Sequence, residues 1–165
     1  MLDGPYDRVV AIRRARTGDV AALTQLAFES KASWGYDEEF MARCRSELVV
    51  DERHVARGLV FVALEGDGDN AVGFYALAPR STSDGELDML FVAPAHMGEG
   101  VGRALLSHST REARRRGWSR LFIESDPFAA TFYERHGAQR EGVSRSRSTG
   151  RDLPLYVMDL STEEG

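Results

Sequence analysis

Three glycines at alternate positions, Gly98, Gly100 and Gly102, lie between an apolar segment and an amphipathic one. The segment before them, residues 86–92, has the composition of a buried strand, and the segment after them has the apolar spacing of a helix. A helix that opens on a glycine-rich turn presents backbone N–H groups without an acceptor in the helix, at the positive end of its dipole. The spacing therefore predicts that this turn binds a phosphate group.

Two common phosphate-binding motifs do not fit this turn. A P-loop needs a lysine after its last glycine, where this chain has Arg103. A dinucleotide fingerprint needs a third glycine at the sixth position, but counting from either Gly98 or Gly100 gives another residue. Glu124 stands where a ribose-binding acid could be expected, yet the turn follows predicted antiparallel strands instead of opening a strand-helix-strand unit. Both motifs are therefore disfavoured.

The elements that would position this turn predict one mixed α/β domain spanning residues 1–165. Three consecutive strands are expected to form an antiparallel meander, and the next strand must pair in parallel with the third because a helix separates them. Helices are predicted at 20–31, 38–50, 101–116 and 127–136, and strands at 8–14, 59–64, 71–77, 86–92, 118–124, 138–148 and 153–160.

Composition restricts the partners and the compartment. A formal net charge of -5 and an isoelectric point near 5.4 give no overall basic field, so neither nucleic acid nor an anionic membrane surface is expected as a partner. Cys44 is the single cysteine, which excludes an internal disulfide and fits a cytoplasmic location. The segment MLDGPYDRVV lacks the features of a secretory signal, and no run of about 18 apolar residues occurs. The histidines lack metal-ligand spacing, so no metal is expected.

The glycine turn resembles the acetyl-CoA site of the GNAT-type N-acetyltransferases. That family has Gln or Arg, two residues, Gly, one residue, and Gly or Ala; Met97, Gly100 and Gly102 occupy these places. A second family pattern, Asn-x-x-Ala-x-x-Phe-Tyr-Glu-x-x-Gly-Phe, is also matched. Its matching residues are Asp126, Ala129, Phe132, Tyr133, Glu134, Gly137 and Ala138.

The resemblance covers residues 9–160 and implies the family's fold. That fold is a GNAT-like mixed, mostly antiparallel sheet of about six or seven strands, flanked by about four helices, with central strands that are parallel and splayed. It also implies acetyl-CoA as cosubstrate. The residues expected to bind it are Leu90, Phe91, Val92, Met97, Gly98, Glu99, Gly100, Val101, Gly102, Arg103, Asp126 and Phe132.

The chain departs from the family pattern at several of these positions. Met97 replaces a polar or cationic side chain, so contacts to a pyrophosphate there would have to come from backbone amides. Glu99 places a negative charge in the turn, and we expect it to point to solvent. Asp126 and Ala138 replace the common Asn and Phe, which is expected to alter contacts to the pantetheine arm or packing without removing the site.

The resemblance also implies catalytic residues. Tyr133 occupies the place of a tyrosine that protonates the leaving thiolate, and Glu86 that of a glutamate acting as general base in some relatives. Asp88 shares a strand face with Glu86, so Asp88 or an ordered water stays open as the base. Trp34 and Tyr36 fall where the resemblance puts part of the acceptor pocket, or else they are packing residues.

Two functions follow from these residues. The first is direct transfer of an acetyl group from acetyl-CoA to a primary amine, because neither motif contains a cysteine that could carry the acyl group. The alternative is a non-catalytic acyl-CoA-binding or regulatory domain. The acceptor, a small-molecule or peptide amine, is not specified by the sequence, nor is the length of the acyl group, and a homodimer is left open.

Overall fold

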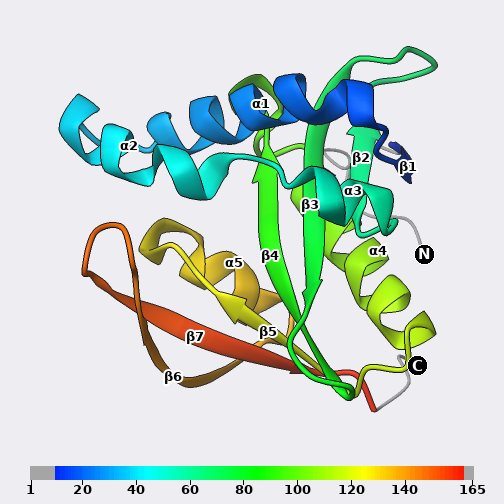
Figure 1. The fold of residues 1–165 in the computed structure, drawn as a ribbon, viewed down its shortest axis with the longest axis vertical. Coiled ribbons are helices and arrows are strands. Elements are labelled where there is room, and N and C mark those ends of the chain that lie inside the picture. The colour runs from blue at the N-terminus through cyan, green and yellow to red at the C-terminus, as the bar shows by residue number, and fades with distance from the viewer. Residues whose placement is uncertain (1–9, 162–165) are drawn as a thin grey trace. The chain divides into compact units, whose positions relative to one another are not determined.

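The structure is a computed structural model that describes residues 10–161. Its seven strands form one sheet in the order β1-β2-β3-β4-β5-β7-β6 (Figure 1). β4 pairs with β5 in parallel, whereas the pairs β1·β2, β2·β3, β5·β7 and β6·β7 are antiparallel. The predicted fold class is confirmed. The strands are β1 Ala11–Arg14, β2 Val60–Leu64, β3 Ala71–Pro79, β4 Asp84–Val92, β5 Arg120–Glu124, β6 Gln139–Arg145 and β7 Asp152–Asp159.

The helices alternate with short 3-10 turns. Within residues 10–161, none of the helices combines the length and the apolar character needed to cross a bilayer. The α-helices are α1 Val20–Ala32, α2 Glu38–Cys44, α3 Glu52–Ala56, α4 Val101–Arg115 and α5 Ala130–Arg135, and the 3-10 helices are η1 Thr17–Asp19, η2 Arg45–Leu48, η3 Pro94–His96 and η4 Pro127–Ala129.

The second predicted helix is shorter than its pattern suggested, and a separate short helix follows it. α2 ends at Cys44, and the chain continues as η2 before it becomes extended at Val49. The backbone N–H of Val50 donates to Thr24 Oγ1 at 3.0 Å, so α1 takes the group that a continued helix would have used. Asp51 then caps α3 by accepting from the backbone N–H of Arg53 at 2.8 Å. Residues 8 and 9 of the first predicted strand lie outside the described residues.

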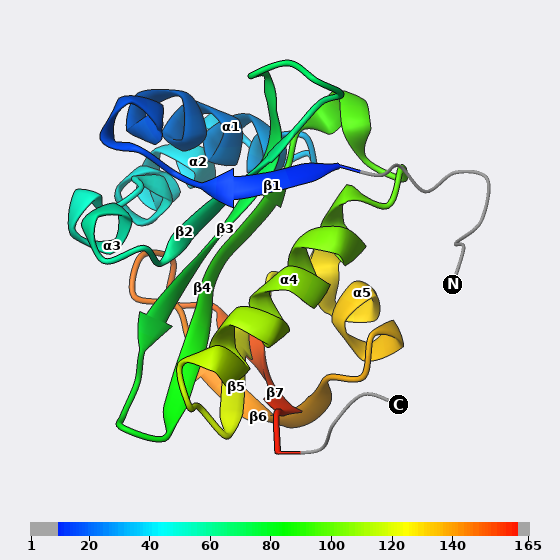
Figure 2. The same ribbon diagram turned by 90° about the vertical axis from the view of Figure 1, so that its right-hand side faces the viewer.

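The chain divides into two compact units, and β3, β4 and α4 contribute to both. The first unit contains the chain up to residue 76 together with residues 89–107. In it, α1, α2 and α3 cover one face of the strands and the first half of α4 lies on the other face (Figure 2). Leu23 and Ala27 of α1 pack with Val62 and Phe74 of the strands in its core. On the opposite face Gly73 is close-packed, since a Cβ there would lie 2.9 Å from Leu105 Cδ1.

The second unit contains residues 77–88 and the chain from residue 108 onward. Its strands β5 and β7 are paired over five residues, and β7 also pairs with β6. The start of β4 joins β5 through Asp84, which accepts two hydrogen bonds from Arg120, Nε to Oδ1 at 3.1 Å and Nη2 to Oδ2 at 2.9 Å. Beside this ion pair the ring of Trp118 covers Gly85. A bidentate ion pair and a ring thus hold the two parallel strands together at one end.

Gly85→Ala is expected to destabilise the protein, because a Cβ at this position would lie 2.1 Å from Trp118 Cε3. Overpacking of this kind costs about 1–3 kcal/mol or more, since the ring or the strand must shift. The matched control is Gly142→Ala on β6, where no heavy atom lies within 4 Å of the added Cβ. Urea unfolding of both variants measures the difference, and equal midpoints for Gly85→Ala and wild type would contradict the packing.

Candidate active site

The predicted phosphate-binding turn lies between η3 and α4, within the first unit. Gly98 and Gly100 adopt φ of 81° and 86°, in the left-handed region that side-chain-bearing residues rarely adopt. Helical hydrogen bonding resumes where the N–H of Ala104 donates to the carbonyl of Gly100 at 3.1 Å. By helix geometry, the amides just before Ala104 have no acceptor inside α4. The left-handed backbone of the turn therefore requires glycine at these two positions. The N–H groups at the start of α4 point away from the helix.

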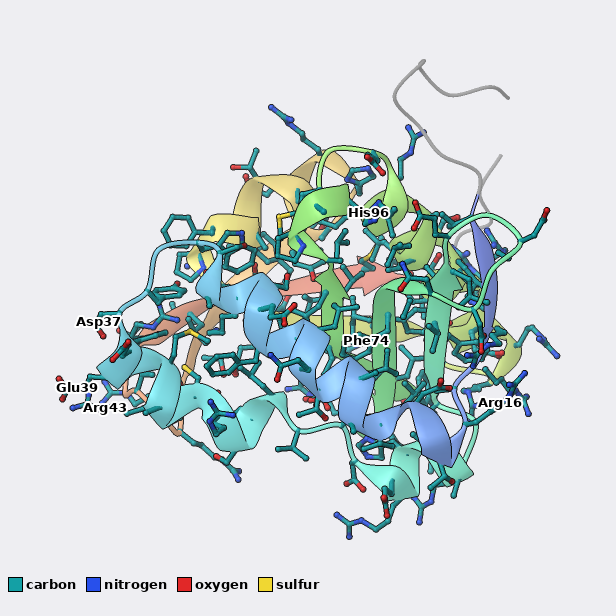
Figure 3. All side chains as sticks on the ribbon, turned by 90° about the horizontal axis from the view of Figure 1, so that it is seen from above. Arg16, Asp37, Glu39, Arg43, Phe74 and His96 are labelled. Carbon is teal, nitrogen blue, oxygen red and sulfur yellow. The ribbon has the colours of Figure 1, made fainter. Side chains whose placement is uncertain are left out.

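The side chains of this turn are arranged differently from expectation at Glu99. Its carboxylate lies 3.0 Å from the ring of His96, measured between Oε1 and Nδ1, and the Glu99 side chain is only 30% exposed. His96 is labelled in Figure 3. Met97 is 38% exposed, in the place where the family pattern has a polar or cationic residue. The turn therefore fits an anionic group through its backbone amides, together with the half-buried Arg103 in the first turn of α4.

β4 and β5 separate a few residues after the start of their pairing. Among the described residues their parallel pairing covers Asp84↔Arg120, Gly85↔Leu121 and Glu86↔Phe122, although β4 continues to Val92. A pocket of about 200 Å³ opens in the second unit at the end of this pairing. It is lined by Arg80, Glu86, Leu87, Asp88, Phe122, Glu124, Ser144 and Leu155.

Three carboxylates and one guanidinium set the charge of this pocket. Arg80 lies over the ring of Phe122, 3.9 Å from its centroid, and its Nη1 is 3.8 Å from Glu86 Oε1. Glu124 accepts a hydrogen bond of 2.5 Å from Ser144 Oγ. Burial raises the pKa of Glu86; the charge of Arg80 lowers it, and the charges of Asp88 and Glu124 raise it further. Glu86 therefore holds a proton more readily than an exposed glutamate does.

Tyr133 lies on α5 in the second unit and is almost fully buried. Its ring meets that of Phe132 edge-on, at 5.2 Å between centroids, and lies 6.3 Å from that of Tyr156. Burial raises the pKa of Tyr133 above its usual range, so the phenol keeps its proton at neutral pH. Tyr156 instead donates its hydroxyl to Glu134 at 2.5 Å. Tyr133 is thus a neutral hydrogen-bond donor in an apolar setting.

Asp126 starts the segment that leads to Tyr133. Its carboxylate accepts from the backbone N–H of Phe128 at 2.9 Å and so caps η4, as the sequence predicted for this position. Its other oxygen lies 3.5 Å from Arg151 Nη2. Asp126 therefore has a structural role as the cap of η4, and its contact with a cofactor remains a prediction.

The structure brings together Glu86 and Asp88, but it does not group the remaining predicted site residues with them in the pocket lining. Trp34 and Tyr36 belong to the first unit, where Tyr36 stacks on Phe40 with 4.1 Å between ring centroids. Leu90, Phe91, Val92 and residues 97–103 also belong to the first unit. Their roles, like that of Tyr133, stay predictions.

Several lining residues were not singled out as site residues. Glu124 carries a usable signal, because it is a carboxylate at the end of a buried strand, but the sequence suggests for it only the disfavoured role of a ribose-binding acid. Arg80 comes from a turn, and Ser144 from an exposed strand with a bulge between Arg140 and Gly142. No spacing rule reaches across such segments. Among the described residues no group of three or more His, Cys, Asp and Glu is arranged to hold a metal ion.

Comparison with known proteins identifies the family. An amino-acid acetyltransferase from Mycobacterium tuberculosis (strain ATCC 25618 / H37Rv) is 30% identical over 139 residues, which cover 83% of this chain and 72% of that protein. A family profile described as "Acetyltransferase (GNAT) domain" matches residues 56–137. The chain belongs to the GNAT acetyltransferases. A streptothricin acetyltransferase from Streptomyces lavendulae is 40% identical over 105 residues, 63% of this GNAT chain and 52% of that protein.

The chain thus spans about half the length of some curated relatives that it matches. Among solved structures, the PaiA N-acetyltransferase of Thermoplasma acidophilum in complex with coenzyme A has a TM-score of 0.75 at 20% identity. The match covers 92% of this GNAT chain and 99% of that one. At this identity the likeness concerns the fold, and that fold holds coenzyme A in the Thermoplasma protein.

The pKa of Glu86 should respond in opposite directions to two neutralising substitutions. Arg80→Gln removes a positive charge and is expected to raise it, whereas Glu124→Gln removes a negative charge and is expected to lower it. An NMR titration of the Glu86 carboxyl carbon measures both shifts. Arg145→Gln is the control, because Arg145 follows Ser144 on the opposite face of β6. Shifts of the same sign in both variants would contradict the electrostatics described.

Proposed function

We propose that this GNAT chain is an acetyl-CoA-dependent N-acetyltransferase that transfers the acetyl group directly to a primary amine. The observation that carries the proposal is the pocket at the end of the β4·β5 pairing, with Glu86, whose pKa is raised by burial, in its lining. Acetyl transfer requires an amine that has lost a proton, and a carboxylate with a raised pKa is suited to receive it. The family, the fold and the glycine turn support the same activity.

Acetyl-CoA supplies the activated acyl group as a thioester, and this chain's residues bind and orient it. The backbone amides of residues 98–102 would hold the pyrophosphate, supported by the helix dipole of α4, because the N–H of Met97 already donates to the carbonyl of Pro94. The N–H of Leu90 donates to the thioester carbonyl, and Phe91 and Val92 offer the strand edge to the pantetheine arm. Support for this assignment is the left-handed backbone of the turn and the half-buried state of these three β4 residues.

Glu86 is the proposed general base. Its side chain is 45% exposed, so it can exchange a proton with solvent or with an intervening water while burial still raises its pKa. Asp88 lines the same pocket but is exposed, which makes it the second candidate, and an ordered water is the third. The charge of Arg80, which lies over the ring of Phe122, lowers the pKa of Glu86 and so favours the ionised form that can accept the proton.

Tyr133 is the proposed donor to the leaving sulfur. A model thiol titrates near pH ~8.5, well below a buried phenol, so complete proton transfer from Tyr133 to a thiolate is uphill. A hydrogen bond from the neutral phenol stabilises the thiolate without that transfer, and its effect is large in an apolar environment. We therefore assign Tyr133 to stabilise the departing thiolate, with protonation completed by water.

Direct transfer is favoured over an acyl-enzyme intermediate. The chain has one cysteine, Cys44, and it is 1% exposed in the core of the first unit. A thiol packed among Leu48 and Met41 is not accessible to a thioester. The proposal therefore has both substrates bound at the same time.

The acceptor is proposed to be a small cationic amine. Three carboxylates, Glu86, Asp88 and Glu124, face a single guanidinium in the pocket lining, which favours positive charge there. The names of two relatives, an amino-acid acetyltransferase and a streptothricin acetyltransferase, refer to acceptors that carry amino groups. A diamine such as cadaverine, an amino acid such as lysine and a streptothricin are the first compounds to test.

The proposed activity predicts both binding and turnover. Calorimetric titration with acetyl-CoA should show saturable binding, and an amine panel should then release free thiol above the rate without amine. Cadaverine should exceed pentylamine of the same length if the pocket selects positive charge. Binding without turnover of any amine would leave a non-catalytic acyl-CoA-binding domain, and absence of binding would exclude both functions.

Tyr133→Phe is expected to lower kcat about 100-fold, the order found when one transition-state donor is removed, with the KM for acetyl-CoA nearly unchanged. The control is Tyr156→Phe, which removes the neighbouring phenol and its hydrogen bond to Glu134 but leaves the proposed donor in place. That control should lose stability and keep kcat. Steady-state kinetics of both variants decide the point, and unchanged kcat in Tyr133→Phe would remove the tyrosine from the mechanism.

A further inference from the structure

Two arginines lie beside the ring of Phe122 in the second unit, and they differ in what their guanidinium groups bind. The Arg120 guanidinium lies 5.0 Å from the ring centroid and donates to both carboxylate oxygens of Asp84. Arg80 lies over the ring at 3.9 Å and lines the pocket. Its ion-pair contact, 3.8 Å from Nη1 to Glu86 Oε1, is too long for a hydrogen bond. Among residues 10–161, the Arg80 side chain therefore donates no hydrogen bond.

The position of Arg80 leaves its N–H groups available to a ligand. A guanidinium donates in its own plane, so the ring under it restrains the group without using these donors. The backbone N–H of Arg80 donates to the carbonyl of Asp84 at 2.9 Å, which holds the turn that carries the side chain. The N–H groups of a guanidinium match the two oxygens of a carboxylate. The pocket wall thus offers a carboxylate a restrained pair of donors.

The acidic residues of the pocket restrict which ligands can use Arg80. Glu86, Asp88 and Glu124 line the pocket with it, and a simple anion would be repelled by their charges. An amine without a carboxylate would leave the donors of Arg80 unused. A molecule with both groups satisfies both signs, and the 3.8 Å between Arg80 Nη1 and Glu86 Oε1 requires its two groups to be close together. The ammonium and the carboxylate of an α-amino acid, which share one carbon, meet this condition.

We propose that Arg80 is a specificity-determining residue that binds the carboxylate of the acceptor, so that the acceptor is a free α-amino acid with its α-amino group beside Glu86. This inference rests on the proposed function and narrows its acceptor from any small cationic amine to an amino acid. Asp88 and Glu124 come two residues further along β4 and β5 than the paired Glu86 and Phe122. Their charges favour an acceptor with a basic side chain, such as lysine.

The proposed orientation determines which amino group of lysine is acetylated. The α-ammonium gives one proton to Glu86, and its lone pair then bonds to the acetyl carbon while the C–S electron pair leaves with sulfur. The second proton released from nitrogen passes through water to the thiolate. The product is therefore Nα-acetyllysine, and the side-chain ammonium is not acetylated.

Calorimetric titration with L-lysine and with cadaverine, which is lysine without its carboxylate, tests the contact in the absence of turnover. Arg80→Gln should weaken lysine binding about 30-fold and leave cadaverine binding unchanged or tighter, because cadaverine has no group for Arg80. Arg80→Lys keeps the charge but loses the planar fork, so it should still weaken lysine binding about fivefold. The control is Arg145→Gln on β6, outside the pocket lining, which should change neither affinity.

Kinetics and product analysis test the orientation. Wild type should convert lysine to Nα-acetyllysine, identified by NMR, and Arg80→Gln should lower the ratio of kcat/KM for lysine to that for cadaverine about 30-fold. This ratio isolates the carboxylate contact, because both amines share the effect of Arg80 on Glu86.

Equal losses for lysine and cadaverine in Arg80→Gln, or Nε-acetyllysine as the main product, would overturn the role of Arg80. Wild type that acetylates cadaverine but does not bind lysine would overturn it too, and the proposed function would stand. Lysine binding that depends on Arg80, without turnover of any amine, would instead support the carboxylate contact and overturn the proposed acetyl transfer.

Discussion

The short parallel contact between β4 and β5 is the constraint on which the candidate pocket depends. Asp84 and Arg120 fix its start with two hydrogen bonds, and Trp118 lies so close to Gly85 that a Cβ there would clash with its ring. Held at this end, the strands pair through Glu86 and then separate. Polar residues can line the space that follows without breaking a continuous hydrogen-bond ladder. The contacts that join the starts of β4 and β5 therefore stabilise the sheet beside the space where these strands separate.

The glycine turn in the first unit and the pocket in the second unit offer groups of opposite charge to a ligand. In the glycine turn the groups suited to bind an anion are backbone amides, whose direction is set by two left-handed glycines, so the proposed anion site does not depend on a polar side chain at Met97. In the pocket the useful groups are carboxylates, with Arg80 restrained by its contact with Phe122. The overall charge of -5 does not predict the local charge of the turn or of the pocket, because each depends on local geometry.

Much of the fold could be predicted from sequence because it depends on local rules. The period of apolar residues located the strands and α1, and Asp126 followed by Pro127 announced a helix start that the structure confirms. The glycines of the turn were informative for the same reason, since positive φ excludes most other residues. The predicted end of the second helix was wrong, because Thr24, which is distant in sequence, accepts a hydrogen bond from the N–H of Val50. Local patterns cannot foresee a competing tertiary acceptor.

The candidate site was predictable only where a residue's role depends on its own strand or helix. Glu86 and Asp88 share a face of β4 by simple alternation, and the pocket contains both. Arg80, Ser144 and the His96–Glu99 contact depend on how turns and a bulged strand fold back, which no spacing in the chain encodes. Of these residues, Arg80 also lowers the pKa of Glu86. The sequence thus predicts the carboxylates of the pocket better than it predicts the neighbouring residues that contact them.

Burial acts on the two proposed catalytic groups in the same direction but with different results. It raises the pKa of both Glu86 and Tyr133, which gives the carboxylate more affinity for a proton and keeps the phenol a donor. For Glu86 this has a cost in folding: a pKa above its unfolded value contributes stability at low pH that is lost as pH rises through the folded pKa. Folding therefore disfavours the ionised form of Glu86, and the Arg80 charge limits that effect. A carboxylate whose ionised form is disfavoured in this way is suited to the proton transfer that we propose for Glu86.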